Sequence, residues 1–334
     1  WSFEVAVLVT GGAGYIGSHM VWRLVDAGEA VVVLDRLSTG FQWAVAPEAV
    51  FVEGDIADEA LVGRLVAQHS IDAVIHFAGS IVVPDSVADP LGYYLNNTVK
   101  SRALMEAVIR AGVRHFIFSS TAAVYGDTGT EPVIETAPTV PQSPYGRSKL
   151  MTEMMLEDAA RAHDFRYVAL RYFNVAGADP RRRTGQSTRG ATHLIKVACE
   201  TALGKRDGTD LYGTDYDTPD GTCVRDYIHV ADLASAHADA LAYLRAGGDS
   251  LVANCGYGHG YSVREVLASV RRVSGRDFSV IERGRRAGDV PAVVANSTRA
   301  RITLGWTPMH DDLDQCVATA LAWEEALGRR NQRD

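Results

Sequence analysis

The chain has 334 residues, of which 47% are hydrophobic and 22% are charged, and its formal net charge is −8. This composition is typical of a globular protein with one large domain or two closely associated domains. The acidic balance argues against a nucleic-acid partner, and the basic run at residues 181–183 is interpreted as a solvated loop. No apolar stretch approaches the ~18 residues of a membrane span, so we expect no membrane partner.

The cysteines lie far apart in the sequence, at Cys199, Cys223, Cys255 and Cys316. No C-x-x-C pair and no histidine at a metal-binding spacing accompanies them. We therefore expect a reduced, cytoplasmic protein that binds no metal.

Short β-branched runs alternate with helical stretches along the first half of the chain. Continuous apolar runs of this kind are typical of strands that are covered on both faces. They predict an α/β fold with a doubly wound parallel sheet of the Rossmann type. The runs are at residues 5–9, 30–34, 49–55, 71–79, 114–120 and 166–174.

The alternation weakens from about residue 175, where a stretch rich in proline, glycine and arginine begins. We predict a first domain over residues 1–176 and a second, smaller α/β substrate domain over residues 177–334. The chain is expected to return to the first domain around residues 222–256, because residues 251–256 look like one more buried strand.

A glycine-rich turn connects the first predicted strand to a helix that begins near Tyr15. Gly12, Gly14 and Gly17 match G-x-G-x-x-G in the strand–turn–helix context that the motif requires. Such glycines allow a tight turn and let the pyrophosphate of a dinucleotide approach the positive end of the helix. The first domain is therefore predicted to bind a dinucleotide, although a purely structural turn is the alternative.

Acidic residues end the next two predicted strands. Asp35 is placed to bind the adenosine ribose and to repel a 2′-phosphate, which favours NAD over NADP. Arg36 follows directly and could pair with a phosphate. Asp55 and Ile56 could border the adenine, or Asp55 could instead cap the following helix.

Residues 143–149 read SPYGRSK and carry the candidate chemistry. Ser143 is a suitable N-cap and Pro144 a suitable first helical residue, so Tyr145 and Lys149 should lie one turn apart on one helix face. Thr121 follows a strand of the sheet, at the edge where open α/β sheets bind ligands. A neighbouring ammonium and an oxidised nicotinamide ring would both favour a phenolate. A surface tyrosine on an ordinary helix is the alternative.

The segments TGGAGYIG, SSTAAVYG and SPYGRSK together resemble the extended short-chain dehydrogenase/reductases. This resemblance implies that Tyr145 is the acid/base, that Lys149 tunes it and holds the nicotinamide ribose, and that Thr121 binds the reacting oxygen. Members that dehydrate or decarboxylate sugars usually carry an acid directly after this threonine, whereas this chain has Ala122 and Ala123. The expected chemistry is therefore limited to one hydride and one hydroxyl proton.

The blocks LDRLSTG, VIHFAGS, RYFNVAGA, VRDYIHVADLA and RRAGDVPA extend the resemblance over nearly the whole chain, to the UDP-glucose/UDP-galactose 4-epimerase family. It implies that NAD⁺ takes the C4 hydride of a UDP-hexose while Tyr145 takes the O4 proton. The 4-keto sugar then turns over before the hydride returns to its other face. It also implies cofactor contacts from Gly11, Gly12, Gly14, Tyr15, Ile16, Gly17, Asp35, Asp55, Ile56, Phe77, Ala78, Gly79, Asn96, Tyr145, Lys149 and Tyr172.

The same resemblance implies how a UDP-sugar would be held. Arginines would clamp the diphosphate, an aromatic residue would meet the uracil, and an aspartate would bind the ribose. At the position of Val293 a tyrosine restricts the pocket to plain hexoses, so valine is expected to admit UDP-N-acetylhexosamines. The implied substrate contacts are Thr121, Tyr145, Asn174, His193, Leu194, Leu211, Tyr212, Arg225, Arg286, Asp289 and Val293.

Two positions depart from the family pattern. Ile81 stands where a lysine often lies near the nicotinamide, and Thr192-His193-Leu194 stands where many relatives have paired asparagines. With Ile81, the positive field on the cofactor would rest more heavily on Lys149. His76 and His229 lie in strand-like surroundings and are expected to be structural.

The helix after Tyr145 carries more apolar residues than one core-facing stripe requires, namely Leu150, Met151, Met154, Met155 and Leu156. The resemblance implies a homodimer that pairs through this helix and the one near Leu104 and Met105. The alternative is that the second domain covers the extra stripe. For the activity, the alternatives are a 4-epimerase of a UDP-pentose or UDP-uronate, a net dehydrogenase, and a non-catalytic nucleotide-binding relative.

Overall fold

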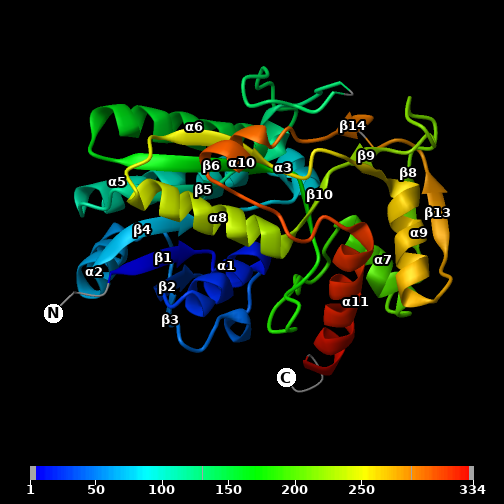
Figure 1. Ribbon diagram of the computed structural model, residues 1–334, viewed down its shortest axis with the longest axis horizontal. Helices are drawn as coiled ribbons and strands as arrows, with labels where there is room; N and C mark the ends of the chain where they lie inside the picture. Colours follow the sequence, from blue (N-terminus) through cyan, green and yellow to red (C-terminus); the bar gives the residue numbers. More distant parts are fainter. Residues whose placement is uncertain (1–4, 130, 287, 331–334) are drawn as a thin grey trace.

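A seven-stranded parallel sheet forms the centre of the protein (Figure 1). The computed structural model describes residues 5–129, 131–286 and 288–330. The strand order is β11-β6-β5-β4-β1-β2-β3, and every pair in the sheet is parallel. The prediction of a doubly wound sheet of the Rossmann type is confirmed. Its strands are β1 (Ala6–Thr10), β2 (Ala30–Asp35), β3 (Val50–Glu53), β4 (Ile71–His76), β5 (His115–Ser119), β6 (Arg166–Tyr172) and β11 (Leu251–Cys255).

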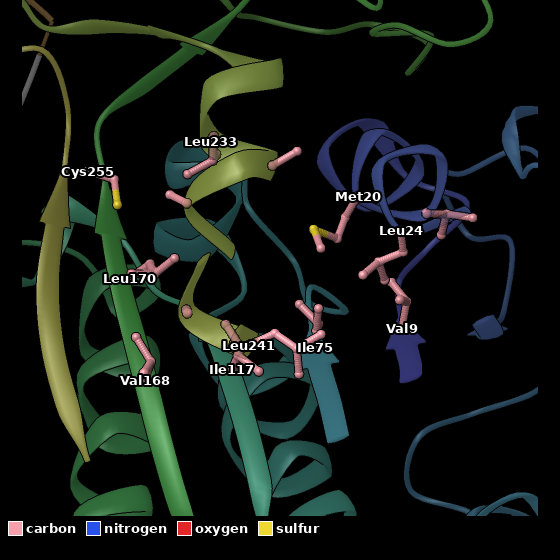
Figure 2. Packing of buried hydrophobic residues seen from close by; sticks show 14 of the residues in the cluster. Val9, Met20, Leu24, Ile75, Ile117, Val168, Leu170, Leu233, Leu241 and Cys255 are labelled. Carbon is pink, nitrogen blue, oxygen red and sulfur yellow. The ribbon is translucent and has the colours of Figure 1, made fainter. Parts of the chain in front are cut away.

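Helices cover both faces of the sheet because successive strand residues point to opposite sides. Val7 and Val9 pack with one hydrophobic cluster, and Ala6 and Leu8 pack with another. The first cluster includes residues of α1 (Tyr15–Asp26) and α8 (Val230–Arg245), as Figure 2 shows for Met20, Leu24, Leu233 and Leu241. The second includes residues of α2 (Glu59–His69), α5 (Lys100–Arg110) and α6 (Pro144–Ala162).

Short elements line the carboxyl edge of the sheet. They are the single-turn segments η1 (Gln42–Ala44) and η3 (Ala122–Val124), the short helices α3 (Val83–Ala88) and α4 (Pro90–Tyr93), and the π-helical segment η2 (Tyr94–Val99), which leads directly into α5. Helix α10 (Thr298–Thr303) packs against the edge strand β11.

The second region lies beside the carboxyl end of β6 and has its own hydrophobic cluster. Its helices are α7 (Leu194–Ala202), α9 (Val263–Ser274) and α11 (Leu313–Arg330), and its paired strands are β8 (Thr209–Tyr212) and β13 (Val280–Arg283). A buried ion pair joins α7 to α11, with Lys196 Nζ 2.6 Å from Glu324 Oε2. The small sheets between the regions are β7 (Asn174–Ala176) with β10 (Tyr227–His229), and β9 (Val224–Arg225) with β12 (Tyr261–Ser262) and β14 (Ala292–Val293).

The order of the strands determines where a ligand can bind. The chain leaves β1 toward β2 on one side, whereas β4 pairs with β1 on the other side. The connections therefore diverge at the carboxyl ends of β1 and β4, which is where open α/β sheets bind ligands. Strands β5 and β6 end at the same edge, so the segments that follow them face the same space.

Several of the apolar residues that suggested a dimer are part of the core. Leu104, Met105 and Leu156 are buried against the sheet, and Met155 packs against the same cluster. These side chains are therefore not available to a partner, whereas Met151 and Met154 are exposed. Among the described residues, no helix is both long and apolar enough to cross a membrane.

Candidate active site

The turn between β1 and α1 is closed by backbone hydrogen bonds. Gly11 has φ +72°, its N–H donates to the carbonyl of Leu34 at 3.0 Å, and the N–H of Gly14 donates to the carbonyl of Gly11 at 3.1 Å. Gly14 caps α1 without a side-chain hydrogen bond. The first N–H groups of this helix are therefore left for an anionic group.

The glycines of this turn also provide space that a Cβ atom would fill. A Cβ at Gly17 would lie 2.2 Å from the carbonyl oxygen of Gly11, and a Cβ at Gly11 would lie 2.6 Å from the backbone nitrogen of Ala78. A Cβ at Gly12 would meet Val33 at 2.8 Å. The turn, the helix and the end of β4 thus pack backbone against backbone, as the dinucleotide motif requires.

Asp35 has two functions at the end of β2. Its carboxylate accepts hydrogen bonds from the N–H of Ala13 at 3.0 Å and from the N–H of Leu37 at 2.8 Å, so it holds the glycine turn in place. Each carboxylate oxygen has a second lone pair, which can accept a ribose hydroxyl. This environment fits an adenosine ribose without a 2′-phosphate.

Asp55 is tied into the structure by cations. It pairs with Lys100, lies 3.8 Å from Arg36, and accepts the N–H of Ala57 at 3.0 Å. Burial would raise the pKa of Asp55, but Lys100 and these hydrogen bonds lower it. The alternative that Asp55 caps the next helix is wrong, because Asp58 is the N-cap of α2 and accepts from Leu61. The neighbouring Ile56 is buried.

Helix α6 begins as the sequence predicted. Ser143 is its N-cap, accepts the N–H of Gly146 at 3.2 Å, and is followed by Pro144 at the first helical position. Tyr145 and Lys149 are both buried on α6, which packs against β6 and η3. The alternative of a surface tyrosine is therefore wrong.

Lys149 and Tyr145 are held by the residues that follow β5. Lys149 Nζ donates to the carbonyl of Ser119 at 3.0 Å and lies 4.8 Å from the centre of the Phe118 ring. Burial lowers the pKa of Lys149 to about 8, although Glu153 raises it. Burial and Tyr172 raise the pKa of Tyr145, and a hydrogen bond with Thr121 lowers it. The structure thus brings Thr121, Tyr145 and Lys149 together.

Tyr172 and the β4 side complete this end of the site. Ser119 Oγ donates to the hydroxyl of Tyr172 at 3.0 Å. Phe77 packs 4.8 Å from the ring of His237, and Ala78 packs against the sheet core. Gly79 lies close to Lys149, since a Cβ there would be 3.8 Å from Lys149 Nζ. Ile81, the departure from the family pattern, is 48% exposed.

The side chain of Asn97 makes several buried hydrogen bonds that the sequence analysis did not predict. Its Oδ1 accepts the N–H of Ser80 at 2.7 Å, and its Nδ2 donates to the Ser80 carbonyl at 2.9 Å and to Ser148 Oγ at 3.0 Å. Asn97 therefore links the segment after β4 to α6. The adjacent Asn96, which the sequence analysis selected, donates to Ser80 Oγ at 2.8 Å. In the sequence, the pair Asn96-Asn97 is the only indication of this network. The pair does not show which of the two amide side chains points inward.

The expected diphosphate and ribose contacts form a second cluster. Asp289 accepts from Arg286 at 3.0 and 3.1 Å and lies 3.8 Å from Arg225. The guanidinium of Arg286 also lies 5.4 Å from the centre of the Tyr212 ring. Val293 pairs with Arg225 in the β9–β14 register and packs against the small cluster that contains Val124 and Phe173.

Other expected substrate residues lie at the start of the second region. Asn174 is at the first position of β7, and its N–H donates to the carbonyl of Asp226 at 3.0 Å. His193 precedes α7 and contacts Gln186 at 2.7 Å. Burial and Lys196 lower the pKa of His193.

The side chain of Leu211 is 1% exposed in the core of this region, and Leu194 packs against the same core. Leu211 could therefore contribute only its backbone to a site.

His76 and His229 are structural in their contacts. His76 bonds to Thr10 at 2.7 Å and to Ser101 at 2.8 Å, and burial lowers its pKa to about 3. His229 accepts the N–H of Ala231 at 3.1 Å at the start of α8, and burial also lowers its pKa to about 3. Both imidazoles are neutral at physiological pH.

Comparison with known proteins agrees with this geometry. Residues 7–256 match the profile of the NAD dependent epimerase/dehydratase family. The chain belongs to this family. It is 58% identical over 321 residues to a UDP-glucose 4-epimerase of Azospirillum brasilense, a match that covers 96% of this chain and 92% of that protein.

Solved structures resemble the whole chain. The UDP-glucose 4-epimerase from Brucella ovis in complex with NAD superimposes with a TM-score of 0.93 at 46% identity, covering 95% of this chain and 98% of that one. The UDP-Glc/GlcNAc 4-epimerase from Campylobacter jejuni superimposes with a TM-score of 0.84 at 46% identity, covering 96% of this chain and 99% of that one.

The close packing of the glycine turn generates a first prediction. Gly17→Ala places a Cβ against the Gly11 carbonyl, so we expect the free energy of unfolding to fall by about 1–3 kcal/mol. The amount of dinucleotide that remains bound should also fall, because the turn must shift. Chemical denaturation and the nucleotide absorbance released on denaturation measure the two effects.

The matched control is Gly63→Ala in α2, where a Cβ would meet nothing within 4 Å. This change should raise the free energy of unfolding by about 0.5–1 kcal/mol and leave bound nucleotide unchanged. Equal behaviour of the two variants would contradict the fit of the turn to a dinucleotide.

Proposed function

We propose that the chain is a UDP-glucose 4-epimerase, which interconverts UDP-glucose and UDP-galactose with bound NAD. The observation that carries the proposal is that Tyr145 lies beside Thr121 and that Lys149, one turn further along α6, bonds to the Ser119 carbonyl at the carboxyl end of β5, where Ala122 and Ala123 supply no further acid. Such a set can move one hydroxyl proton beside a hydride acceptor. The family and the epimerases among its relatives support the same reaction.

The cofactor would be held by the residues of the first region. The N-terminus of α1 and the glycine turn would bind the pyrophosphate, Asp35 the adenosine ribose and Lys149 the nicotinamide ribose. When bound there, NAD supplies the acceptor for the C4 hydride and returns it. We propose that residues 1–176, with a return around residues 222–256, form the NAD-binding domain, and that residues 177–334 form the substrate-binding domain.

Tyr145 would take the proton from O4 of the sugar and later return it. Burial keeps the phenol neutral, so a positive environment is needed to make it a base. Lys149, one turn further along α6, provides a positive charge while its ammonium is protonated. Thr121, which hydrogen-bonds Tyr145, would orient the reacting oxygen.

The cluster around Asp289 would bind the UDP moiety. Two guanidinium groups share a single carboxylate, so the cluster keeps a net positive charge and unused N–H donors for a diphosphate. Tyr212 is 37% exposed and would stack against the uracil. The sugar would then extend toward Val293 and the catalytic residues.

A second copy of the chain is the partner that we propose. The partner would bind an apolar surface formed by exposed side chains of α3, α4, η2 and α6. These four elements pack against one another. We call this the α6–η2 surface, and it consists of Val87, Leu91, Leu95, Val99, Met151 and Met154. Exposed apolar side chains gathered on neighbouring elements are typical of a protein–protein interface.

We also propose a cytoplasmic location. The four cysteines are free thiols and all are buried. Free thiols in a protein of this type fit a reducing compartment.

The catalytic assignment is tested with purified protein and UDP-galactose. The parent should form UDP-glucose without net consumption of NAD⁺. Tyr145→Phe should fold normally and lose about 10² to 10⁴-fold in turnover, because the proton acceptor is gone. Chromatography of the nucleotide sugars measures the product, and near-parental turnover by this variant would contradict the assignment.

The range of sugars is tested at Val293. We expect UDP-N-acetylglucosamine to be accepted, because valine leaves space that a tyrosine would fill. Val293→Tyr should depress turnover of the acetamido sugar at least about tenfold and spare UDP-glucose, since a filled pocket excludes the larger group. Val50→Tyr, at an exposed position of the edge strand β3, is the control. Equal losses on both sugars, or no acetamido turnover by the parent, would count against this role.

The dimer is tested by a charge on the α6–η2 surface. Met154 is 53% exposed, so Met154→Glu should leave the fold intact and convert a dimer into a monomer at micromolar concentration. The change buries an unpaired carboxylate in the proposed interface. Ile302→Glu on α10 is the control, because Ile302 is 78% exposed and lies outside this surface. A monomeric parent in light scattering would refute the proposal.

A further inference from the structure

Glu153 continues the buried face of α6 that carries Tyr145 and Lys149. The three residues follow one another at intervals of one helical turn, and Glu153 is 4% exposed. A buried carboxylate is costly unless it is paired and hydrogen-bonded. The hydrogen bonds and the ion pair of Glu153 therefore show which segments of the chain it fixes.

Arg171 on β6 provides the pairing. Its Nη2 lies 2.5 Å from Glu153 Oε2, and its Nε lies 3.0 Å from Oε1 and 3.2 Å from Oε2. The side chains of both partners are almost fully buried, at 7% and 5% exposure. This bidentate geometry fixes the carboxylate on α6 relative to the central sheet.

The same ion pair holds both ends of the segment that follows β5. Ser120 Oγ donates to Glu153 Oε1, and the guanidinium of Arg171 lies 4.8 Å from the centre of the Tyr125 ring. Between these points lies Thr121, which is close enough to Tyr145 to lower its pKa. Directly before them lies the Ser119 carbonyl, which accepts from Lys149. One buried ion pair thus holds the backbone that positions the catalytic side chains.

The titratable groups around this pair fall into neutral and charged ones. His76 on β4 is neutral, since burial lowers its pKa to about 3. Burial also raises the pKa of the tyrosines on the surrounding elements, so they remain protonated: Tyr93, Tyr125, Tyr145, Tyr167 and Tyr172. The charged groups of the pair and its helix face are Lys149, Glu153 and Arg171. Nearby lie Glu135, whose carbonyl accepts from Arg171 at 3.4 Å and whose carboxylate is 3.7 Å from Arg299, and Glu157 and Arg161, which act on Tyr167.

Removal of the carboxylate would leave two buried cations. Arginine does not release its proton under these conditions, whereas a buried lysine does so readily. Lys149 would then lose its proton first. We propose that Glu153 is a positioning residue, which keeps Lys149 protonated and fixes the Ser119–Thr121 segment against α6. This inference rests on the proposed function for its meaning in catalysis, but the ionisation of Lys149 can be measured without turnover.

The test compares Glu153→Gln with the parent, both with bound NAD. Turnover of UDP-galactose is measured against pH, and the alkaline loss of activity should move down by about one pH unit or more, because Lys149 loses the nearby opposite charge. Glu153→Asp keeps the charge, so its alkaline loss should coincide with that of the parent. A pH profile of Glu153→Gln that coincides with the parental profile would overturn the proposal.

A second measurement separates this inference from the proposed function. The pKa of Lys149 is about 8 in the folded protein, below the value of ~10.4 for a free lysine. Between these values Lys149 binds more protons in the unfolded chain, so it makes the free energy of unfolding rise with pH. The buried Cys199, Cys255 and Cys316, whose pKa values burial raises, act in the opposite direction in the parent and the variant alike, so the rise due to Lys149 is read from the difference between the two. In Glu153→Gln this rise should begin at lower pH. An unshifted rise would refute the proposal even if the parent proved to be no epimerase.

Two further variants serve as controls, one for the loss of any buried carboxylate and one for a failure of Glu153→Gln to fold. Glu324→Gln also removes a buried carboxylate, but Lys196 keeps Glu200 at 3.1 Å, so its alkaline loss of activity should not move. Should Glu153→Gln fail to fold, Ser120→Ala still removes the link between the carboxylate and the segment after β5. It should lower kcat about tenfold with KM unchanged, because only the positioning is lost. An unchanged kcat would overturn the positioning role.

Discussion

The buried polar face of α6 is the constraint on which the site depends. A helix that packs against a sheet normally buries apolar side chains, but this one buries Ser148, Lys149, Thr152 and Glu153. Each buried polar group needs a partner, and the partners come from three other elements: Asn97, the Ser119 carbonyl, and Arg171. The ends of β4, β5 and β6 are therefore fixed to the helix that carries Tyr145. The buried polar face of α6 therefore determines both the arrangement of the site and the packing of the sheet edge.

The second region is joined to the first by contacts that begin on α1. The hydroxyl of Tyr15 donates to the Gly177 carbonyl at 2.6 Å, and Ser18 bonds to Thr184 at 2.7 Å. Arg183 pairs with Asp26 and with Asp179. The loop that follows β7 is thus attached to the helix whose first turn we propose to bind the dinucleotide. The proposed cofactor site and the second region are therefore linked through this one helix.

The sequence predicted those features whose signal is local. Strands buried on both faces appear as continuous apolar runs, and the start of α6 appears in the pair Ser143-Pro144, so both were found. Features that depend on distant partners were not. Asn97 bonds to Ser148, and Asp226 accepts the N–H groups of Tyr257 and Gly258. The Asn96-Asn97 pair does not show which amide is buried, and the residues next to Asp226 do not indicate its distant partners. The helix near Leu104 looked available for pairing because its burial against the sheet cannot be read from periodicity alone.

Asp35 links the choice of cofactor to the folding of the turn. The carboxylate that we propose to disfavour a 2′-phosphate is also the group that holds the N–H of Ala13 and the N–H of Leu37, a residue with φ +57°. A neutral or smaller side chain at this position would relax the discrimination and leave both N–H groups without their acceptor. Evolution toward NADP would therefore need a second, compensating change in the turn, and directed evolution that varies this position alone would meet a loss of stability before it gained a new specificity.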